Sequence, residues 1–254
     1  MKDFYNAFYR AIEHSQAHHL FCERVYGKDL GQHGFADMEQ IELLLQVTRL
    51  RPGQSTLDLG CGDGRMAEYL SDRSGARFTG LDYILQAIEL ARQRTAAKAE
   101  HLDFAVSDIN HLDLPPATFD LILSVDTLYF SEDYAATLAA LKTALKPDGQ
   151  IAIFFSYGRE PWVPMDQFPK ERLPADQTPL AAALNANGLS FQAWNLTSQD
   201  YAQALRRRAA LDELKPLFEA ENNLFIYENR MGDSQGIRQA IEDGLHARYL
   251  YLAQ

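Results

Sequence analysis

Apolar and polar positions divide the middle of the chain into short apolar runs that alternate with longer amphipathic stretches. The apolar runs predict strands at 55–57, 77–81, 102–106, 119–124 and 151–155. Helical periodicity predicts helices between them, over 65–70, 83–98 and 133–145. Strands that alternate with helices of this length indicate a parallel sheet with helices on both faces. The few polar residues within the strands fit burial on both sides.

The two ends of the chain depart from this alternation. Residues 3–25 are predicted as helical, and His18 and His19 are expected on the surface of that helix. A glycine-rich loop follows from Tyr26 to Phe35, and Asp37 is predicted to cap the next helix. Beyond the fifth strand the pattern predicts a proline-rich loop over 157–177, a helix over 179–187, a strand over 189–196, a helical unit over 198–245 with Arg206–Arg208 on a polar face, and a last strand over 246–252.

Bulk composition excludes several classes of protein. The formal net charge of -11 argues against nucleic acid as a partner, because binding to phosphates needs a basic face. No apolar run approaches the roughly 20 residues of a membrane span, and the first residues lack the pattern of a signal peptide. Two cysteines indicate no disulfide framework, and no cluster of ligands predicts a metal site. A cytoplasmic location is therefore expected.

The most specific motif is a glycine-rich turn between the first strand and the first helix of the alternating region. It runs from Asp58 to Gly64 and has glycines at Gly60, Gly62 and Gly64. Glycines let a ligand approach the backbone, and the amides at the start of the helix face that ligand. A dinucleotide fingerprint requires a third glycine at position 65, which is Arg65, so this cofactor class is excluded.

This spacing resembles the first motif of the class I S-adenosylmethionine-dependent methyltransferases. Other blocks of that family follow in order, namely a carboxylate after the second strand at Asp82, the turn at Asp108, and Lys146-Pro147-Asp148-Gly149 before the fifth strand. The resemblance is strong over about residues 50–156. It implies a Rossmann-like α/β fold with a seven-stranded, mostly parallel sheet, helices on both faces and an antiparallel last strand. To this fold the chain adds N-terminal helices and a helical insertion between the last two strands.

The resemblance also implies which residues hold the cofactor. The three glycines would support its methionine part, with Cys61 as a small residue in the turn, and Asp58 would hold the loop or, through water, the cofactor's amino group. Asp82 would accept hydrogen bonds from both ribose hydroxyls. Asp108 would accept from the adenine amino group, and the ring would be flanked by residues after the second and third strands. The full set implied for the cofactor is Tyr26, Asp58, Gly60, Cys61, Gly62, Gly64, Asp82, Tyr83, Asp108, Ile109 and Ser124.

Three side chains are candidates for the chemistry. Asp126 follows the fourth strand, at the edge of the sheet where open α/β sheets bind ligands, and it would orient, deprotonate or neutralise an acceptor. Tyr129 follows three residues later and would position the acceptor or contact the sulfonium through its ring. His33 is the best candidate base, because histidine titrates near neutral pH and this one lies in a shaped loop.

The sequence therefore predicts an enzyme that moves a methyl group from S-adenosylmethionine to nitrogen, oxygen or carbon of a small molecule by in-line displacement, leaving S-adenosylhomocysteine. Two alternatives stay open, a catalytically silent S-adenosylmethionine-binding partner subunit and an aminopropyl transferase on a similar fold. The whole chain, 1–254, is expected to form one methyltransferase domain. Its expected parts are a helical lid (1–49), a cofactor-binding core (50–156) and substrate-cap elements (157–177 and 198–245).

Overall fold

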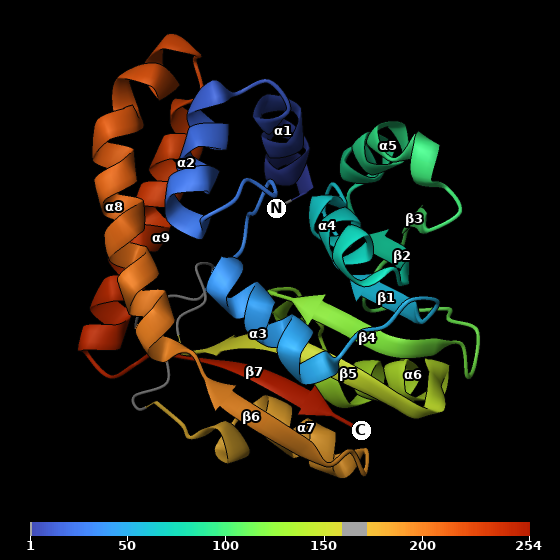
Figure 1. Cartoon of the computed structure of the whole chain (residues 1–254). Coiled ribbons are helices and arrows are strands. Elements are labelled where there is room, and N and C mark those ends of the chain that lie inside the picture. The colour runs from blue at the N-terminus through green and yellow to red at the C-terminus, as the bar shows by residue number, and fades with distance from the viewer. Residues whose placement is uncertain (1, 159–171) are drawn as a thin grey trace.

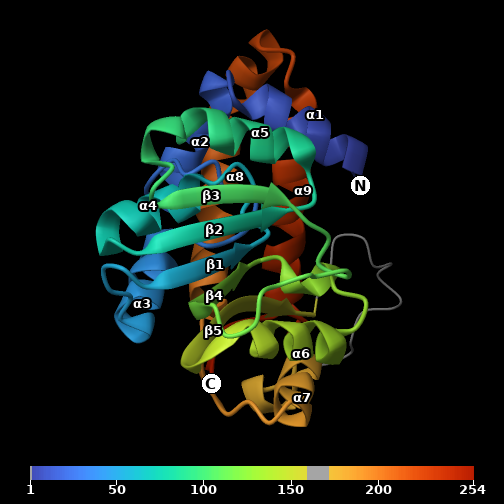
Figure 2. The same ribbon diagram turned by 90° about the vertical axis from the view of Figure 1, so that its right-hand side faces the viewer.

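The computed structural model describes residues 2–158 and 172–254. Within these residues, seven strands form one sheet in the order β3-β2-β1-β4-β5-β7-β6. Only β7 runs antiparallel to its neighbours (Figures 1 and 2). The strands are β1 (Ser55–Leu59), β2 (Arg77–Asp82), β3 (Leu102–Val106), β4 (Phe119–Val125), β5 (Leu145–Tyr157), β6 (Phe191–Asn195) and β7 (Ala247–Ala253). The predicted Rossmann-like sheet with an antiparallel last strand is confirmed.

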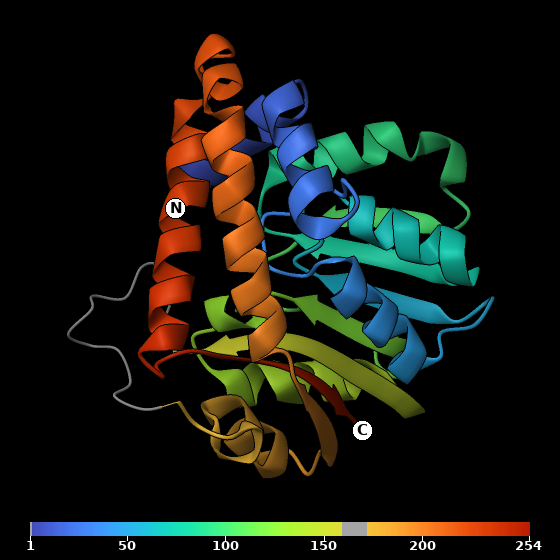
Figure 3. The ribbon, with the colours of Figure 1, turned by 60° about the vertical axis from the view of Figure 1, so that its left-hand side comes forward.

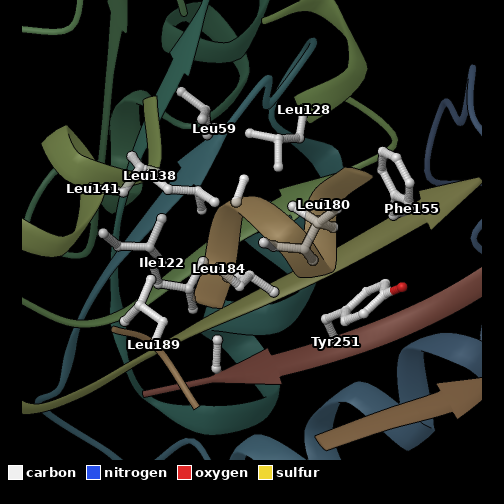
Figure 4. Close-up of a cluster of buried hydrophobic side chains, with 14 of the residues drawn as sticks. Leu59, Ile122, Leu128, Leu138, Leu141, Phe155, Leu180, Leu184, Leu189 and Tyr251 are labelled. Carbon is white, nitrogen blue, oxygen red and sulfur yellow. The ribbon is translucent and has the colours of Figure 1, made fainter. Parts of the chain in front are cut away.

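Helices cover both faces of this sheet. On one face lie α6 (Tyr134–Ala144) and α7 (Pro179–Ala186), and on the other lie α3 (Met38–Thr48), α4 (Arg65–Ser74) and α5 (Leu85–Arg94). Alternation along β4 explains the two layers, because Ile122 packs with α6 and α7 whereas Leu121 and Leu123 pack on the opposite face. Figure 4 shows the first of these clusters, where Ile122 meets Leu138, Leu141, Leu180 and Leu184.

A third apolar cluster joins both ends of the chain. It forms among α1 (Lys2–Ile12), α2 (Gln16–Tyr26), α8 (Thr197–Ala220) and α9 (Leu224–Glu242), with Phe8, Phe21, Leu211 and Phe218 fully buried. In Figure 3, α8 and α9 stand as a pair beside α2, and α8 packs against both. The predicted helical insertion between the last two strands is thus present, and its partner is the N-terminal helical segment.

Several local expectations were wrong. The stretch 3–25 forms two helices. The first ends at Ile12, and Ser15 caps the start of the second, because its hydroxyl accepts a hydrogen bond from the His18 amide at 3.1 Å. β5 starts at Leu145, which pairs with Phe119, and the next pair joins Leu121 to Gln150, so residues 146–149 bulge within the strand. Three further turns are 3-10 helices: η1 (Ala96–Lys98), η2 (Leu128–Phe130) and η4 (Ala175–Gln177).

Two predicted surface side chains are buried instead. His18 has no exposed surface and Arg207 only 1%. Both face the interface between α2 and the helical insertion, where Arg230 of α9 lies 3.2 Å from His18 Nε2. Single-sequence periodicity had put them on polar faces, because it does not show that a second helix pair covers these positions.

Candidate active site

A cavity of about 430 Å³ lies beyond the C-terminal ends of β1, β2 and β4. This edge of an open α/β sheet is where ligands bind. The cavity brings together residues that the sequence had singled out from distant segments. Those on its surface are His33, Asp58, Gly60, Cys61, Gly62, Asp82, Tyr83, Asp108, Ile109, Asp126 and Tyr129.

The glycine-rich turn forms one wall of the cavity. Gly60, Gly62 and Gly64 have φ values of 79°, 56° and 74°, in the left-handed region that favours glycine. A Cβ on Gly60 would collide with Thr127, and one on Gly62 would lie 2.7 Å from the hydroxyl of Tyr9. The turn therefore presents backbone atoms to the cavity, and a side chain on Gly60 or Gly62 would collide with its surroundings.

Asp82 lies at the end of β2 and is tied to this turn. Its carboxylate accepts hydrogen bonds from the amides of Gly62 and Ile84, each at 2.9 Å. Burial raises the pKa of this carboxyl, and the backbone amides oppose that shift. Each oxygen keeps further acceptor capacity, and the group lines the cavity. Two acceptors side by side fit a vicinal diol such as a ribose and would repel a phosphate at the same point.

The neighbouring residues complete this end of the cavity. Tyr83 is half exposed and Ile84 is buried, and Ile109 stands across from them on the segment after β3. Asp108 accepts from the Asn110 amide at 3.0 Å, and this hydrogen bond, together with His111, lowers its pKa. A carboxylate beside apolar side chains fits the edge and faces of a purine ring.

Asp58 lies beneath the glycine-rich turn and is almost fully buried. Burial, with a smaller effect from the charge of Asp82, raises the pKa of this carboxyl to about 7. Burial also keeps Cys61 a neutral thiol, because it raises the pKa well above the ordinary value. In the described residues, no group of three or more histidine, cysteine, aspartate or glutamate side chains could hold a metal ion.

Aromatic side chains form another part of the cavity wall, and one of them, Tyr9, reaches the glycine-rich turn. Tyr5 and Tyr9 come from α1, and Tyr129 and Phe130 come from the 3-10 turn after β4. The ring centroids of Tyr129 and Phe130 lie 4.9 Å apart, and those of Tyr5 and Phe130 lie 6.4 Å apart. Burial raises the pKa of Tyr5 to about 12 and that of Tyr129 well above its usual range, so both hydroxyls stay protonated at neutral pH.

His33 lines the cavity from the loop between α2 and α3. Its ring lies edge-on between Tyr5 and Phe8, with centroids 4.9 and 4.8 Å away. Among the described residues, its buried Nε2 has no hydrogen-bond partner. Burial, and after it the charges of Arg230 and Arg207, lower the pKa of His33 well below 6.5, so the ring is neutral at physiological pH.

Asp126 also lines the cavity, but its charge is already balanced. Both carboxylate oxygens accept from the guanidinium of Arg248, which is fully buried in β7, and one accepts from the Phe35 amide at 2.7 Å. Arg248 also lies 3.2 Å from Asp200. These contacts favour a structural role for Asp126, in which it joins β7 to the loop before α3, over proton transfer or neutralisation of a cationic acceptor.

Three of the residues implied for the cofactor lie off the described surface of the cavity. Tyr26 is buried in α2, where its hydroxyl donates to the Gly34 carbonyl at 2.8 Å and accepts from Arg207 at 2.7 Å. Gly64, at the start of α4, faces Phe104 of β3. Ser124 is fully buried within the sheet. Most of the proline-rich loop over 157–177 falls outside the described residues.

Sequence reasoning missed the residues that hold Asp126 and the loop before α3 in place. Arg248 interrupts the apolar run Ala247-Arg248-Tyr249-Leu250, and a charge in a predicted buried strand is a sign of a buried partner. Arg207 and Arg230 gave no comparable sign, because arginines are common on exposed helix faces. The helical periodicity of residues 3–25 likewise gave no sign that Tyr5 and Tyr9 line a cavity.

Comparison with known proteins agrees with this geometry. Residues 57–153 match the family model described as a methyltransferase domain. Phosphoethanolamine N-methyltransferase 1 of Arabidopsis thaliana is 29% identical over 157 residues, which cover 62% of this chain and 31% of that protein. A ubiquinone biosynthesis O-methyltransferase of Idiomarina loihiensis is 36% identical over 105 residues, 41% of this chain and 42% of that protein. The chain thus spans about a third of the length of the first relative.

Solved structures show the same fold along nearly the whole chain. Phosphoethanolamine N-methyltransferase 2 of Haemonchus contortus, in complex with phosphomonomethylethanolamine and S-adenosylhomocysteine, has a TM-score of 0.77 at 19% identity, covering 98% of this chain and 59% of that one. The [4+2]-cyclase SpnF has a TM-score of 0.72 at 16% identity, covering 100% and 94%. The fold therefore does not fix the reaction.

Residues 57–153 form a class I S-adenosylmethionine-dependent methyltransferase domain, which confirms the family inferred from the glycine-rich turn. Solved structures of the Haemonchus contortus enzyme hold S-adenosyl-L-homocysteine in one case and S-adenosyl-L-methionine in another. None of the described helices is long and apolar enough to cross a membrane. The cytoplasmic location and the exclusion of nucleic acid stay predictions.

Proposed function

We propose that this chain is a methyltransferase that moves the methyl group of S-adenosylmethionine to a small-molecule acceptor. One observation carries the proposal. A single cavity is lined by the glycine-rich turn and Asp82, which we name its cofactor end, and by His33 with a group of aromatic side chains, which we name its acceptor end. This arrangement provides one site for a nucleoside cofactor and an adjoining space for an acceptor. Alignment of donor and acceptor is the main contribution such a protein makes to the reaction.

The cofactor end of the cavity would be used as follows. When bound, S-adenosylmethionine supplies a methyl group that is activated by a positive sulfur. Asp82 would accept from the ribose hydroxyls, the backbone of Gly60 and Gly62 would lie along the methionine part, and Asp58 would support its amino group. Asp108 and Ile109 would contact the adenine. Cys61 and Tyr83 border this space, whereas Tyr26, Gly64 and Ser124 would act only indirectly through the turn and loop they support.

The acceptor end would bind and orient the nucleophile. Neutral His33 has a buried ring nitrogen without a partner among the described residues, so it would accept a hydrogen bond from the acceptor. Tyr129 would donate from a hydroxyl that stays protonated. Asp126 would hold this end together through Arg248 and the Phe35 amide and would not act as a base.

The acceptor that we propose is a small amine. The rings of Tyr5, Tyr129 and Phe130 suit the cationic product of N-methylation, because an ammonium is attracted to aromatic faces. The phosphoethanolamine N-methyltransferases among the relatives act on an amine of this size. The N-terminal segment 1–49 would form a lid over this space, since Tyr5, Tyr9 and His33 line it.

A transfer assay tests the function directly. Purified protein would be incubated with S-adenosylmethionine carrying a deuterated methyl group and with phosphoethanolamine, ethanolamine or a catechol. Mass spectrometry should detect a labelled methyl on an amine product together with S-adenosylhomocysteine, and the Asp82→Ala variant should lose most of this activity.

Each open alternative has its own outcome in the same assay. Tight binding of S-adenosylhomocysteine with no transfer to any acceptor would favour the silent partner subunit. Transfer of an aminopropyl group from decarboxylated S-adenosylmethionine, with no methyl transfer, would favour the aminopropyl transferase. Either result would overturn the proposed methyltransferase activity.

A further inference from the structure

The helical insertion, residues 198–245, contacts the loop between α2 and α3, and this loop lines the cavity. Among the described residues, none from 198–245 lines the cavity, whereas six residues between Leu30 and Ala36 do. Three polar side chains of the insertion are nevertheless buried against this loop. Gln203 and Arg230 have no exposed surface, and Arg207 has 1%. Their buried position needs a reason, because arginine is rarely fully buried without a partner.

These side chains hydrogen-bond to the loop backbone at successive residues. Gln203 Nε2 donates to the carbonyl of Phe35, and Arg207 Nη2 donates to that of Gly34, each at 2.7 Å. Arg230 spans two carbonyls, that of His33 at 2.7 Å and that of Gln32 at 2.9 Å. Four consecutive carbonyls of the loop, from residue 32 to residue 35, are therefore held by α8 and α9.

Loop carbonyls and aromatic rings surround the two guanidinium groups, although Arg207 Nη1 and Arg230 Nε have no hydrogen-bond partner among the described residues. Arg207 lies 3.8 Å from Asp233 and over the ring of Phe35, with its guanidinium carbon 4.3 Å from the ring centroid. Arg230 faces carbonyl oxygens and the ring of Phe8, 5.1 Å from its centroid. A buried cation is costly unless its hydrogen bonds are satisfied. An apolar interface would join the helices without this cost, so the arginines point to a requirement for a fixed loop.

We infer that Gln203, Arg207 and Arg230 are positioning residues, which hold loop 32–35 in the shape that presents His33 to the acceptor. The planar fork of arginine suits this task, because it donates in two fixed directions, whereas lysine donates from a single point. The insertion thereby shapes the acceptor end of the cavity without touching the acceptor. The part of this inference that concerns the acceptor rests on the proposed function. The part that concerns the hydrogen bonds to loop 32–35 does not.

Four variants separate this role from a general effect on folding. Arg230→Lys keeps the charge and loses the fork, and Arg230→Met loses both. Gln203→Leu removes the donor to the Phe35 carbonyl and the oxygen that accepts from Arg207 Nε at 3.2 Å, without changing any charge. Arg208→Met is the matched control, because Arg208 is an exposed neighbour on α8 that pairs with Asp212 of the same helix at 2.9 Å.

Hydrogen exchange and ligand binding are the main measurements. In Arg230→Lys, amides of peptides covering residues 28–37 should exchange about tenfold faster than in the wild type, while amides of β1 and β4 keep their rates. The KM for phosphoethanolamine, or for the acceptor that the transfer assay identifies, should rise about tenfold with kcat changed less than about threefold. S-adenosylhomocysteine should bind with nearly unchanged Kd. Gln203→Leu should give the same pattern more weakly, and Arg208→Met should match the wild type.

Two results would overturn the inference. One is wild-type exchange over residues 28–37 in folded Arg230→Lys and Gln203→Leu. The other is faster exchange spread equally over the sheet, which would indicate lost stability and not a freed loop. If Arg230→Met fails to fold, the lysine and Gln203→Leu variants decide. If the wild type methylates no acceptor, the proposed function fails. Hydrogen exchange and S-adenosylhomocysteine affinity would then still test whether Gln203, Arg207 and Arg230 hold loop 32–35.

Discussion

The two ends of the cavity are built in different ways. The cofactor end comes from short segments directly after strands, with the glycine-rich turn, Asp82 and Asp108 held mainly by backbone amides. The acceptor end comes from α1, the loop before α3 and the turn after β4. Side chains from α8, α9 and β7 hold this second end through buried arginines.

This difference shows which part of the site depends on local conformation and which on the assembly of the whole chain. The cofactor end needs only neighbouring parallel strands and the turns that follow them, since Asp82 and Asp108 accept hydrogen bonds from backbone amides of those turns. The acceptor end exists only when residues near 33, 126, 207, 230 and 248 come together, and it uses buried charges to do so. Substitutions should therefore affect stability most at the acceptor end and cofactor affinity most at the other.

The largest effect is expected at the ion pair of the acceptor end. Asp126→Asn leaves the buried guanidinium of Arg248 without one of its two carboxylate partners, and should lower the free energy of unfolding by about 3 kcal/mol. Urea denaturation measures this value. Asp103→Asn, on exposed β3 surface, is the control and should change stability little. A loss as small as in the control would mean that the two ends do not differ as described.

At the cofactor end the main effect should be on binding. Asp82→Ala removes the acceptor pair at the end of β2 and should weaken S-adenosylhomocysteine more than about tenfold, or roughly 1.4 kcal/mol. Calorimetric titration measures this change, with Asp103→Ala as the control. Unchanged affinity in a folded Asp82→Ala variant would rule out the ribose assignment.

The buried carboxyl beneath the glycine-rich turn should make cofactor binding depend on pH. With a pKa of about 7, Asp58 is mostly protonated at pH 6 and ionised at pH 8. The ammonium group of S-adenosylhomocysteine favours the carboxylate, so affinity should fall as the pH is lowered, by up to about tenfold between pH 8 and pH 6. Asp58→Asn should remove this dependence. A pH profile equal to that of the wild type would assign the titration to another group.

The smallest effect is expected from the hydroxyl of Tyr129. Tyr129→Phe keeps the ring and removes one neutral hydrogen-bond donor, which is worth about 1 kcal/mol. We expect kcat/KM for the acceptor to fall about fivefold and the Kd of S-adenosylhomocysteine to stay constant. A change in cofactor affinity as large as that in turnover would place this hydroxyl at the cofactor end.

The contrast also explains what the sequence could and could not predict. The sheet and its helices could be predicted from patterns of short range, such as alternating strands. The family resemblance also predicted that Gly60, Gly62 and Asp82 lie together, and all three line one cavity. The burial of Arg207, Arg230 and His18 did not follow, because it depends on α8 and α9 packing against α2 across most of the chain length. Asp126 was found from its place after β4, but its pairing with Arg248 required the antiparallel strand β7.

The most direct test of the account is a calorimetric titration of the wild-type chain with S-adenosylmethionine and S-adenosylhomocysteine. The account predicts that both bind at micromolar Kd, roughly -8 kcal/mol, to one site per chain. Binding of neither ligand by folded protein would contradict it, because the glycine-rich turn and Asp82 would then form a cavity for some other molecule.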